Sequence, residues 1–248
     1  MPISTIDDSQ RAAARIAGIT YLLALVSANF ASFYVASKLI VDGDAAKTVA
    51  NIVASERLFR LGIASDLFTF AADIVLIIAL YVILRPINRN LALLALSWRL
   101  VETSIFVVTT LNSLNVLRLL SGAPYLRAFE GDRLQALTML SIRAHGAGYN
   151  VGLIFFGLGS TVFCYLFFKS NYIPRVLAGW GVFSSLLVAI CTFAFIIFPN
   201  LADSLEPGCF IPIFIFELVT GFWLLIKGLN QPGWVKGVKI GVADPGQR

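Results

Sequence analysis

The sequence is poor in charged residues. Asp, Glu, Lys and Arg make up 13% of its 248 residues, whereas soluble globular chains contain about 25%. Hydrophobic residues reach 58%, and the mean hydropathy is +0.84. So little charge cannot coat a water-soluble body of this size, which excludes a disordered chain, a secreted disulfide scaffold and a nucleic-acid-binding domain. The net charge of +5 does not alter this, because excess Lys and Arg is typical of the cytoplasmic loops of membrane proteins.

Histidine and cysteine are also scarce. The single histidine, His145, cannot build a histidine-rich zinc or di-iron site. The three cysteines, Cys164, Cys191 and Cys209, are odd in number and have no CxxC spacing. A thiol within an apolar run behaves as a small buried hydrophobe. We therefore expect no disulfide bond, no metal site and no cofactor.

Several motifs of membrane and soluble enzymes are missing. The chain has no HExxH metalloprotease motif, no GxSxG nucleophile elbow, no P-loop and no paired aspartate-rich transferase motif. These absences make an enzyme the less favoured class, and we assign no catalytic residue.

Long apolar runs are what the sequence has in abundance. A helix needs about 20 apolar residues to cross a bilayer core about 30 Å thick, and six runs are long enough. We predict an all-α polytopic membrane protein, a bundle of six transmembrane helices in one domain. Its expected parts are a cytoplasmic N-terminal segment at 1–15, the helical domain at 16–229 and a cytoplasmic tail at 230–248. The predicted spans are 16–40, 61–84, 91–117, 149–168, 176–198 and 210–226.

The first run has an alternative interpretation. Arg11 and Arg15, followed by apolar residues at 19–26 and small residues at 27–31, have the layout of a signal peptide with its cleavage site. Apolar residues continue through Val35, however, which makes the run long enough for a full span. We expect this run to stay in the membrane as a helix.

Basic residues predict the orientation of the bundle. The loops 85–90 and 169–175 each carry two basic residues and no acid, whereas 199–209 carries Asp203 and Glu206 and no base. Short loops rich in Lys and Arg stay in the cytoplasm, and longer mixed loops weigh less. We therefore predict that both termini are cytoplasmic.

Two of the outer loops have amphipathic patterns. Residues 44–59 begin with Asp44, which suits an N-cap, and place apolar side chains mainly on one face. Residues 132–144 have a similar pattern and can run directly into the fourth span, with a glycine pair as a kink. We predict two short amphipathic helices at the outer surface.

Few ionisable residues lie within the predicted spans, and such residues are candidates for a functional site. At 1.5 Å per residue, Asp73, Arg99, Glu102 and Glu217 lie about 12–16 Å from the cytoplasmic ends of their helices. One arginine would face up to three carboxylates, and Arg99 can pair with Glu102 three residues away. The set is either a site that binds or conducts a proton or small cation, or an ion-pair network that fixes helix packing.

A second polar layer lies nearer the outer face. The same helical rise places Asp66, Asn112 and Asn150 about 27–32 Å from the cytoplasmic ends, with His145 a little beyond. An aspartate beside a histidine can act as a general base or hold a polar ligand. This layer supports an alternative function, a lipid- or amphiphile-binding protein or membrane enzyme with an outer-leaflet cavity that uses Asp66 and His145.

A stripe of small residues marks the fourth span. Gly148 and Gly152 form a GxxxG pattern, which Gly157 and Gly159 continue. Such stripes let helices approach closely within a chain or between subunits, and we expect packing within the chain. The expected partners are membrane lipids and not nucleic acid, with a homo-oligomer or a larger membrane complex as alternatives and the ligand unassigned.

Several segments of the chain match a pattern found in one protein family. Taken in order they cover about residues 11–230, and they resemble the bacterial multi-pass membrane family catalogued as domain of unknown function 4386. The resemblance implies a protein of the bacterial cytoplasmic (inner) membrane that retains its first span, with no established activity and no known catalytic residues. The segments are 15–22 (RIAGITYL), 59–66 (FRLGIASD), 84–89 (LRPINR), 145–159 (HGAGYNVGLIFFGLG), 172–179 (YIPRVLAG) and 217–228.

The same resemblance bears on the candidate residues. It implies that most of them occupy motif positions of the family, whereas Glu102 lies where the pattern is looser. The positions that match are Asp66, Asp73, Arg99, His145 and Glu217.

Overall fold

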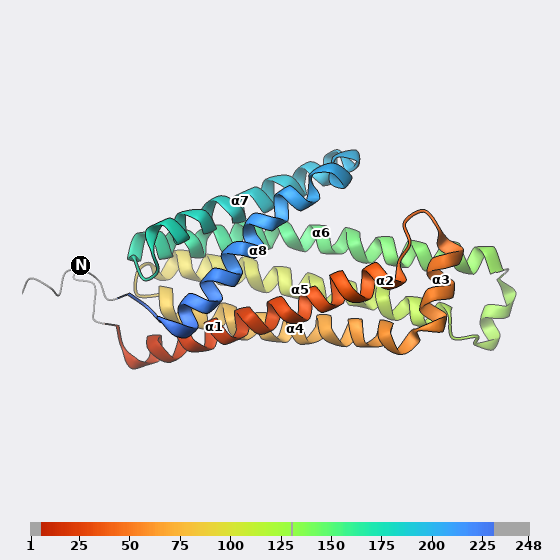
Figure 1. The fold of residues 1–248 in the computed structure, drawn as a ribbon, viewed down its shortest axis with the longest axis horizontal. Coiled ribbons are helices and arrows are strands. Elements are labelled where there is room, and N and C mark those ends of the chain that lie inside the picture. The colour runs from red at the N-terminus through yellow and green to blue at the C-terminus, as the bar shows by residue number, and fades with distance from the viewer. Residues whose placement is uncertain (1–5, 130, 231–248) are drawn as a thin grey trace, which may run out of the picture.

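The structure is a computed structural model that describes residues 6–129 and 131–230. All regular elements in these ranges are helices (Figure 1). The predicted tail from residue 231 onward and the side chains of Asp203 and Glu206 lie outside the described part. In chain order the elements are α1 Asp8–Asn29, the π-helix η1 Phe30–Ala36, α2 Ser37–Leu39, α3 Ala45–Ala54, α4 Glu56–Leu84, α5 Arg89–Leu119, the 3-10 helix η2 Pro124–Ala128, α6 Gly131–Ser170, α7 Arg175–Ile197, the 3-10 helix η3 Pro199–Leu201 and α8 Ala202–Ile226.

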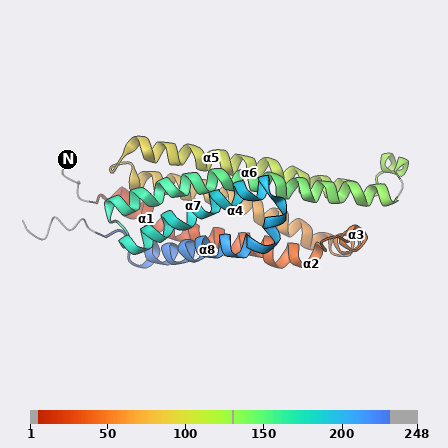
Figure 2. The same cartoon turned by 90° about the horizontal axis from the view of Figure 1, so that it is seen from above.

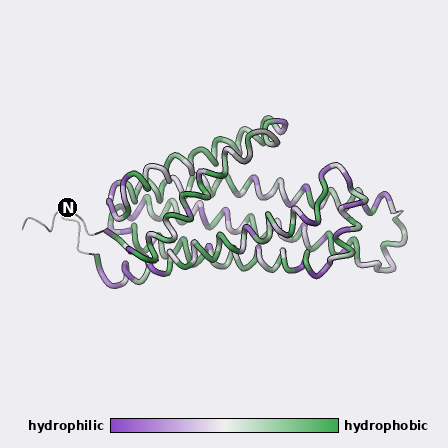
Figure 3. The backbone as a smooth tube through the Cα atoms, in the orientation of Figure 1, coloured by the Kyte–Doolittle hydropathy of each residue, from purple (hydrophilic) through white to green (hydrophobic). Residues whose placement is uncertain are grey.

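Six helical stretches in the described ranges are long and apolar enough to cross a membrane. Apolar residues dominate the middle of these stretches, and hydrophilic residues gather toward their ends (Figure 3). The predicted all-α polytopic membrane fold is confirmed. The six stretches are Asp8–Leu39, Glu56–Leu84, Arg89–Leu119, Gly131–Ser170, Arg175–Ile197 and Gly208–Ile226.

Side-chain caps determine where two of these helices begin. The Asp7 carboxylate accepts a hydrogen bond of 2.7 Å from the backbone N–H of Gln10, and the Gln10 side chain accepts one of 3.2 Å from the backbone N–H of Asp7. This capping box starts α1 at Asp8, well before the predicted span at 16. Asn88 starts α5 in a similar way, because its side chain accepts a hydrogen bond of 3.1 Å from the N–H of Leu91. The caps satisfy N–H groups that have no partner within the helix.

The six long helices form a ring. Each packs against the next one along the chain, and α8 packs against α1. Short connections make consecutive helices antiparallel neighbours, as both views of the bundle show (Figures 1 and 2). Following the predicted orientation, we call the end at which α1 begins the inner end and the opposite end the outer end. Side chains that point into the ring from different helices can therefore meet at its centre.

The inner end of the ring is filled by a large apolar core, here called the inner core. All six long helices contribute buried side chains to it. Apolar side chains therefore make up most of the packing at the inner end of the ring. The largest members of the inner core are Tyr21, Leu76, Ile77, Leu80, Ile83, Leu84, Phe163, Leu166, Phe167, Tyr172 and Ile173.

Tyr172 links both ends of the described chain to this core. Its hydroxyl accepts a hydrogen bond of 3.3 Å from Gln10 Nε2, which also lies 3.0 Å from the carbonyl oxygen of Ile83. Its own carbonyl oxygen accepts a hydrogen bond of 2.8 Å from the N–H of Asn230. The start of α1 and the segment after α8 therefore meet at the loop between α6 and α7.

The first predicted outer helix is present as α3 and is shorter than expected. Asp44 caps it, accepting a hydrogen bond of 2.8 Å from the N–H of Lys47. The helix breaks at Ser55, and residues from Glu56 onward belong to α4. Ile52 faces a second apolar cluster, the outer core, whose buried members are Val35, Leu39, Ile52, Phe59, Ile63, Val116 and Leu117.

The second predicted outer helix is the first part of α6. The segment 132–144 runs without interruption into the fourth span, so that α6 has 40 residues and is about 60 Å long. A bilayer core is about 30 Å thick, so roughly half of α6 lies beyond it. The α5–α6 hairpin accordingly projects farther at the outer end than the α7–α8 hairpin (Figure 2).

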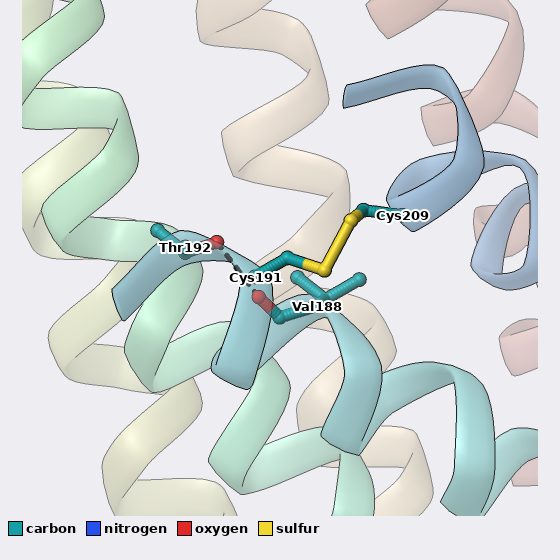
Figure 4. The surroundings of a disulfide bond; sticks show 4 residues. All are labelled: Val188, Cys191, Thr192 and Cys209. Carbon is teal, nitrogen blue, oxygen red and sulfur yellow. Dashed lines mark hydrogen bonds between the residues drawn. A yellow bond between two sulfur atoms is a disulfide. The ribbon is translucent and has the colours of Figure 1, made fainter. Parts of the chain in front are cut away.

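The expectation that the cysteines form no disulfide is wrong for two of them. A disulfide joins Cys191 on α7 to Cys209 on α8, with their Cα atoms 6.3 Å apart (Figure 4). The helices are antiparallel neighbours, so cysteines 18 residues apart lie at the same height in the hairpin. No local cysteine spacing in the sequence indicates this pair. Trp180 Nε1 makes a second link between the two helices by donating a 3.0 Å hydrogen bond to the carbonyl oxygen of Pro212. Cys164, the free cysteine of the described part, is buried.

The small-residue stripe of α6 packs within the chain, as expected. A Cβ atom on Gly152 would overlap the ring of Phe106 on α5. A Cβ atom on Gly159 would lie 2.7 Å from Cγ of Arg99, which is also on α5. Gly157 faces α7, where a Cβ would lie 2.7 Å from a carbonyl oxygen. The stripe therefore lets α6 approach both of its neighbours closely.

Candidate functional site

Arg99 is the centre of a buried charged network in the middle of the ring. It is 3% exposed, and its Nη1 lies 3.1 Å from Glu102 Oε2. Its Nη2 lies 3.7 Å from Asp73 Oδ1. The ring of Phe156 covers the guanidinium at 4.4 Å, a cation–π contact. Three of the four residues predicted for this layer are thus in contact.

Three helices position these groups. Asp73 comes from α4, and Arg99 and Glu102 come from α5, where their spacing of three residues places them side by side. On α6, the absence of a side chain at Gly159 leaves room for the stem of Arg99. Ser160, the next residue, accepts a hydrogen bond of 3.4 Å from Arg99 Nη1.

Glu217 joins the network from α8 at longer range. Its carboxyl group interacts electrostatically with Arg99 and Asp73, and among the described residues no partner lies within ion-pair distance of it. Phe216 packs against α7 and Gly221 packs against α1, which leaves Glu217 on the intervening face of α8, toward the centre of the ring. We refer to Asp73, Arg99, Glu102 and Glu217 together as the network.

The network holds more acid than base. Three carboxyl groups face one guanidinium, and Glu102, 1% exposed, has an Oε2 atom that is ion-paired with Arg99 but forms no hydrogen bond within the described residues. One turn from Glu217 on α8, the buried Oγ1 of Thr220 also has no hydrogen-bond partner in the part of the chain that the structure describes. A buried polar atom left without a hydrogen bond costs about 1–3 kcal/mol. The network therefore retains capacity to accept or donate further hydrogen bonds.

Two hollows on the described surface lie away from the network. One of about 300 Å³ is lined by Arg118, Tyr125 and neighbouring residues at the outer end. Another of about 540 Å³ lies beside Glu56 and Arg60, where α4 begins. Neither includes a residue of the network, whose central arginine is enclosed by protein on every side.

The outer polar layer assembles only in part. His145 Nδ1 on α6 lies 3.2 Å from Ser113 Oγ and 3.3 Å from the carbonyl oxygen of Thr109, both on α5. Asn112 Nδ2 lies 3.5 Å from Thr109 Oγ1. His145 and Asn112 therefore belong to one small polar contact between α5 and α6.

Asp66 and Asn150 are not part of that contact. Asp66 is half-buried on α4, and among the described residues no ion pair or hydrogen bond joins its carboxylate to His145. Its charge instead acts on Tyr149 of α6. The side chain of Asn150 is half-buried and forms no hydrogen bond within the described part of the chain. The acid–histidine pair that the alternative function requires is thus not formed.

Tyr149 is a residue that the sequence analysis did not single out. Its ring stacks on that of Phe106, with centroids 4.1 Å apart and planes at 10°. Its phenol interacts electrostatically with Asp66 and with three carboxyl groups of the network, those of Asp73, Glu102 and Glu217. Its spacing in the sequence could have identified it. Tyr149 precedes Phe156, whose ring covers Arg99, by seven residues and therefore lies on the same face of α6.

Comparison with known proteins identifies the family. The sequence profile described as a domain of unknown function, DUF4386, matches residues 16–228. An uncharacterized protein of Archaeoglobus fulgidus is 28% identical over 159 residues, which are 63% of this chain and 76% of the relative. No solved structure matches the chain. Because the profile reaches all six long helices, the chain belongs to the DUF4386 family.

Proposed function

We propose that this protein resides in the cytoplasmic (inner) membrane of a bacterium and binds a small cation, in the simplest case a proton, at the network. The observation that carries the proposal is the imbalance at the centre of the ring, where Asp73, Glu102 and Glu217 face the single guanidinium of Arg99. Glu102 supports it, because its carboxylate is ion-paired with Arg99, forms no hydrogen bond within the described residues at Oε2, and can still accept a proton or coordinate a cation.

The cost of burying charge distinguishes a binding site from a packing device. Each ion removed from water costs several kcal/mol unless an opposite charge compensates it. A structural ion pair needs one acid for one base, and the network has two acids beyond that number. These two carboxyl groups are neutralised if they hold protons or share a bound cation. Passage of that cation across the membrane is the activity that such a site would serve.

Two independent features support the orientation. The loops 85–90 and 169–175, rich in basic residues, both lie at the inner end of the ring, and such loops remain in the cytoplasm. The Cys191–Cys209 disulfide lies toward the outer end of the α7–α8 hairpin, and disulfides persist outside the reducing cytoplasm. We therefore place both ends of the described chain on the cytoplasmic side.

The proposal is tested by comparing Asp73→Asn with Asp66→Asn. Both changes remove a carboxylate from α4, and the two positions lie two turns apart, but only Asp73 contacts Arg99. Thermal stability of the purified protein is measured in Li⁺, Na⁺ and K⁺ against choline at constant ionic strength. In parallel, the infrared band of protonated carboxyl groups is followed as pH is varied. We expect a cation- or pH-dependent signal in the wild type and in Asp66→Asn that is lost in Asp73→Asn.

Two other outcomes contradict the proposal. If the wild type shows no cation-dependent stability and no titrating buried carboxyl group, the network is a packing device. If Asp66→Asn abolishes the signal while Asp73→Asn preserves it, the site is the outer polar layer. Proteoliposomes with an internal pH dye then test passage, with faster decay of an imposed gradient expected for the wild type than for Asp73→Asn.

A further inference from the structure

Three aromatic rings lie outward of the network, and the outermost of them reaches the level of the outer polar layer. They belong to Phe70 on α4, Phe106 on α5 and Tyr149 on α6, with centroids 5.5 Å apart for the first pair and 4.1 Å for the second. At 1.5 Å per residue these rings lie about 21–32 Å from the inner ends of their helices, whereas Asp73 and Arg99 lie about 15–17 Å from theirs. We call these three rings the aromatic layer.

A glycine on α6 makes room for this layer. A Cβ on Gly152 would overlap the ring of Phe106, so α6 can pack this closely against α5 only because residue 152 has no side chain. Phe70 and Phe106 are both buried. Tyr149 is held by its ring, while its hydroxyl has no hydrogen-bond partner among the described residues. The aromatic layer is therefore one ring deep, and its one polar group is the hydroxyl of Tyr149.

The inner side of the network is closed much more deeply. The inner core reaches from Leu76, one turn from Asp73, to Tyr172 in the loop between α6 and α7. Along α4, the segment from Leu76 to Leu84 corresponds to about 12 Å of apolar packing. Opening this side would separate buried side chains from all six helices, whereas opening the outer side would move the three rings and the smaller outer core.

From this asymmetry we infer that the network exchanges its cation with the outer side, and that Phe70, Phe106 and Tyr149 form the gate. The identity of the cation rests on the proposed function; the side of access does not. Asp66, about 27 Å from the inner end of α4, lies at the level of the gate and interacts electrostatically with Tyr149. Its negative charge attracts cations to the rings and repels anions.

The gate is tested by the accessibility of a cysteine at the network. The reporter is Ser160→Cys, since Ser160 Oγ lies 3.4 Å from Arg99 Nη1, in a Cys164→Ser background that keeps the Cys191–Cys209 disulfide. A cationic, membrane-impermeant methanethiosulfonate reagent is applied to intact cells and, separately, to inverted membrane vesicles. We expect slow labelling from the outside, because the open form of a gate is typically a minor state of about 0.1–10%.

Removal of one ring should open the outer side alone. Phe106→Ala is expected to raise labelling of the reporter in intact cells by about tenfold or more, as the open population approaches the whole. The matched control is Phe163→Ala, which removes a buried aromatic ring of the inner core on α6 and should leave labelling from outside unchanged. Phe106→Leu, which loses the ring and keeps an apolar side chain, replaces Phe106→Ala if that variant is not monodisperse.

Three results overturn the inference. They are an unchanged labelling rate in the Phe106 variants, an equal acceleration by Phe163→Ala, and faster labelling from inverted vesicles than from cells. Labelling requires no bound cation, so this test and that of the proposed function can fail separately. If labelling follows the expectation while Asp73→Asn alters no cation- or pH-dependent signal, the gate stands and the cation site does not.

Discussion

At the inner end, all six long helices converge on one apolar core, whereas at the outer end they separate into two groups. One outer group contains η1, α2, α3, α4, α5 and the start of α6 and shares the outer core. The other is the α7–α8 hairpin, which packs against α6 through a smaller cluster of Cys164, Val188, Ile213 and Phe216. The outer tip of this hairpin diverges from the rest of the bundle (Figure 1).

The difference places the network at a boundary. Inward of Arg99 the packing is one large and mainly apolar cluster, and outward of it the helices are held by smaller clusters, single polar contacts and one disulfide. Regions with fewer buried contacts open at lower free-energy cost than the main core. We therefore expect the outer halves of the helices to move relative to one another while their inner halves stay packed together.

The largest effect should come from removing the charge at the boundary itself. Arg99→Met leaves the carboxyl groups of Asp73, Glu102 and Glu217 buried without a cation, which is expected to reduce the free energy of unfolding by about 3–5 kcal/mol. Reversible unfolding in mixed detergent micelles measures this. Arg99→Met combined with Glu102→Gln should recover part of the loss, and an unchanged stability in the single variant would show that the two halves do not depend on the network.

Loss of the disulfide should affect the outer half alone. Cys191 and Cys209 close a loop with a sequence separation of 18, for which the chain-entropy model gives about 3 kcal/mol. In Cys191→Ser/Cys209→Ser we expect faster amide hydrogen exchange at the outer tip of α7 and α8 and unchanged exchange around Ile83. Faster exchange at Ile83 as well would mean that the two halves unfold as one unit.

Truncation in the inner core sharpens the comparison from the other side. Leu80→Ala removes a buried side chain and is expected to cost about 1–3 kcal/mol, since the loss of packing remains although lipid replaces water as the surrounding medium. Ile211→Ala, on an exposed face of α8, is the control and should change stability by less than about 0.5 kcal/mol. Similar losses in both variants would contradict the dominance of the inner core.

The smallest effect should arise at the second link of the α7–α8 hairpin. Trp180→Phe removes the hydrogen bond to the carbonyl oxygen of Pro212 and is expected to cost about 0.5–1.5 kcal/mol. Thermal unfolding followed with and without a reductant measures it, because the bond should matter more once the disulfide is broken. An effect of equal size in both conditions would show that the two links act independently.

Most of the fold could be predicted from the sequence because bilayer thickness imposes a length on apolar runs. The first span was predicted to begin at residue 16, whereas α1 begins at Asp8. The capping box of Asp7 and Gln10 that starts this helix lies outside any apolar run, so hydropathy does not detect it. The outer segment 132–144 joined α6 because no residue in it ends a helix. Helix ends depend on caps and breaks, which hydropathy does not register.

The candidate site was predictable in depth and not in detail. Helical rise alone placed Asp73, Arg99 and Glu102 at one level, and the structure brings them into contact. The rise per residue does not give the rotation of a helix about its own axis relative to its neighbour. That rotation brings Ser160 to Arg99 and directs His145 to α5 instead of to Asp66.

The cysteine pair fell outside prediction for a related reason. Local spacing detects cysteines that meet within a turn or a knuckle, whereas Cys191 and Cys209 meet through the register of two antiparallel helices. Glu102 shows the converse. The resemblance to the family gave its position less weight than the other candidates, whereas the structure makes it the most buried carboxylate of the network.

The closed order of the helices makes the chain nearly cyclic in space. Gln10 near the start and Asn230 near the end both bond to Tyr172, and α1 packs directly against α8. A circularly permuted protein, with a short linker between these two residues and new termini opened in the 85–90 loop, would retain every helix pair of the ring. Fusion partners could then be attached at the inner ends of α4 and α5, the helices that carry Asp73 and Arg99, without altering the packing around these two residues.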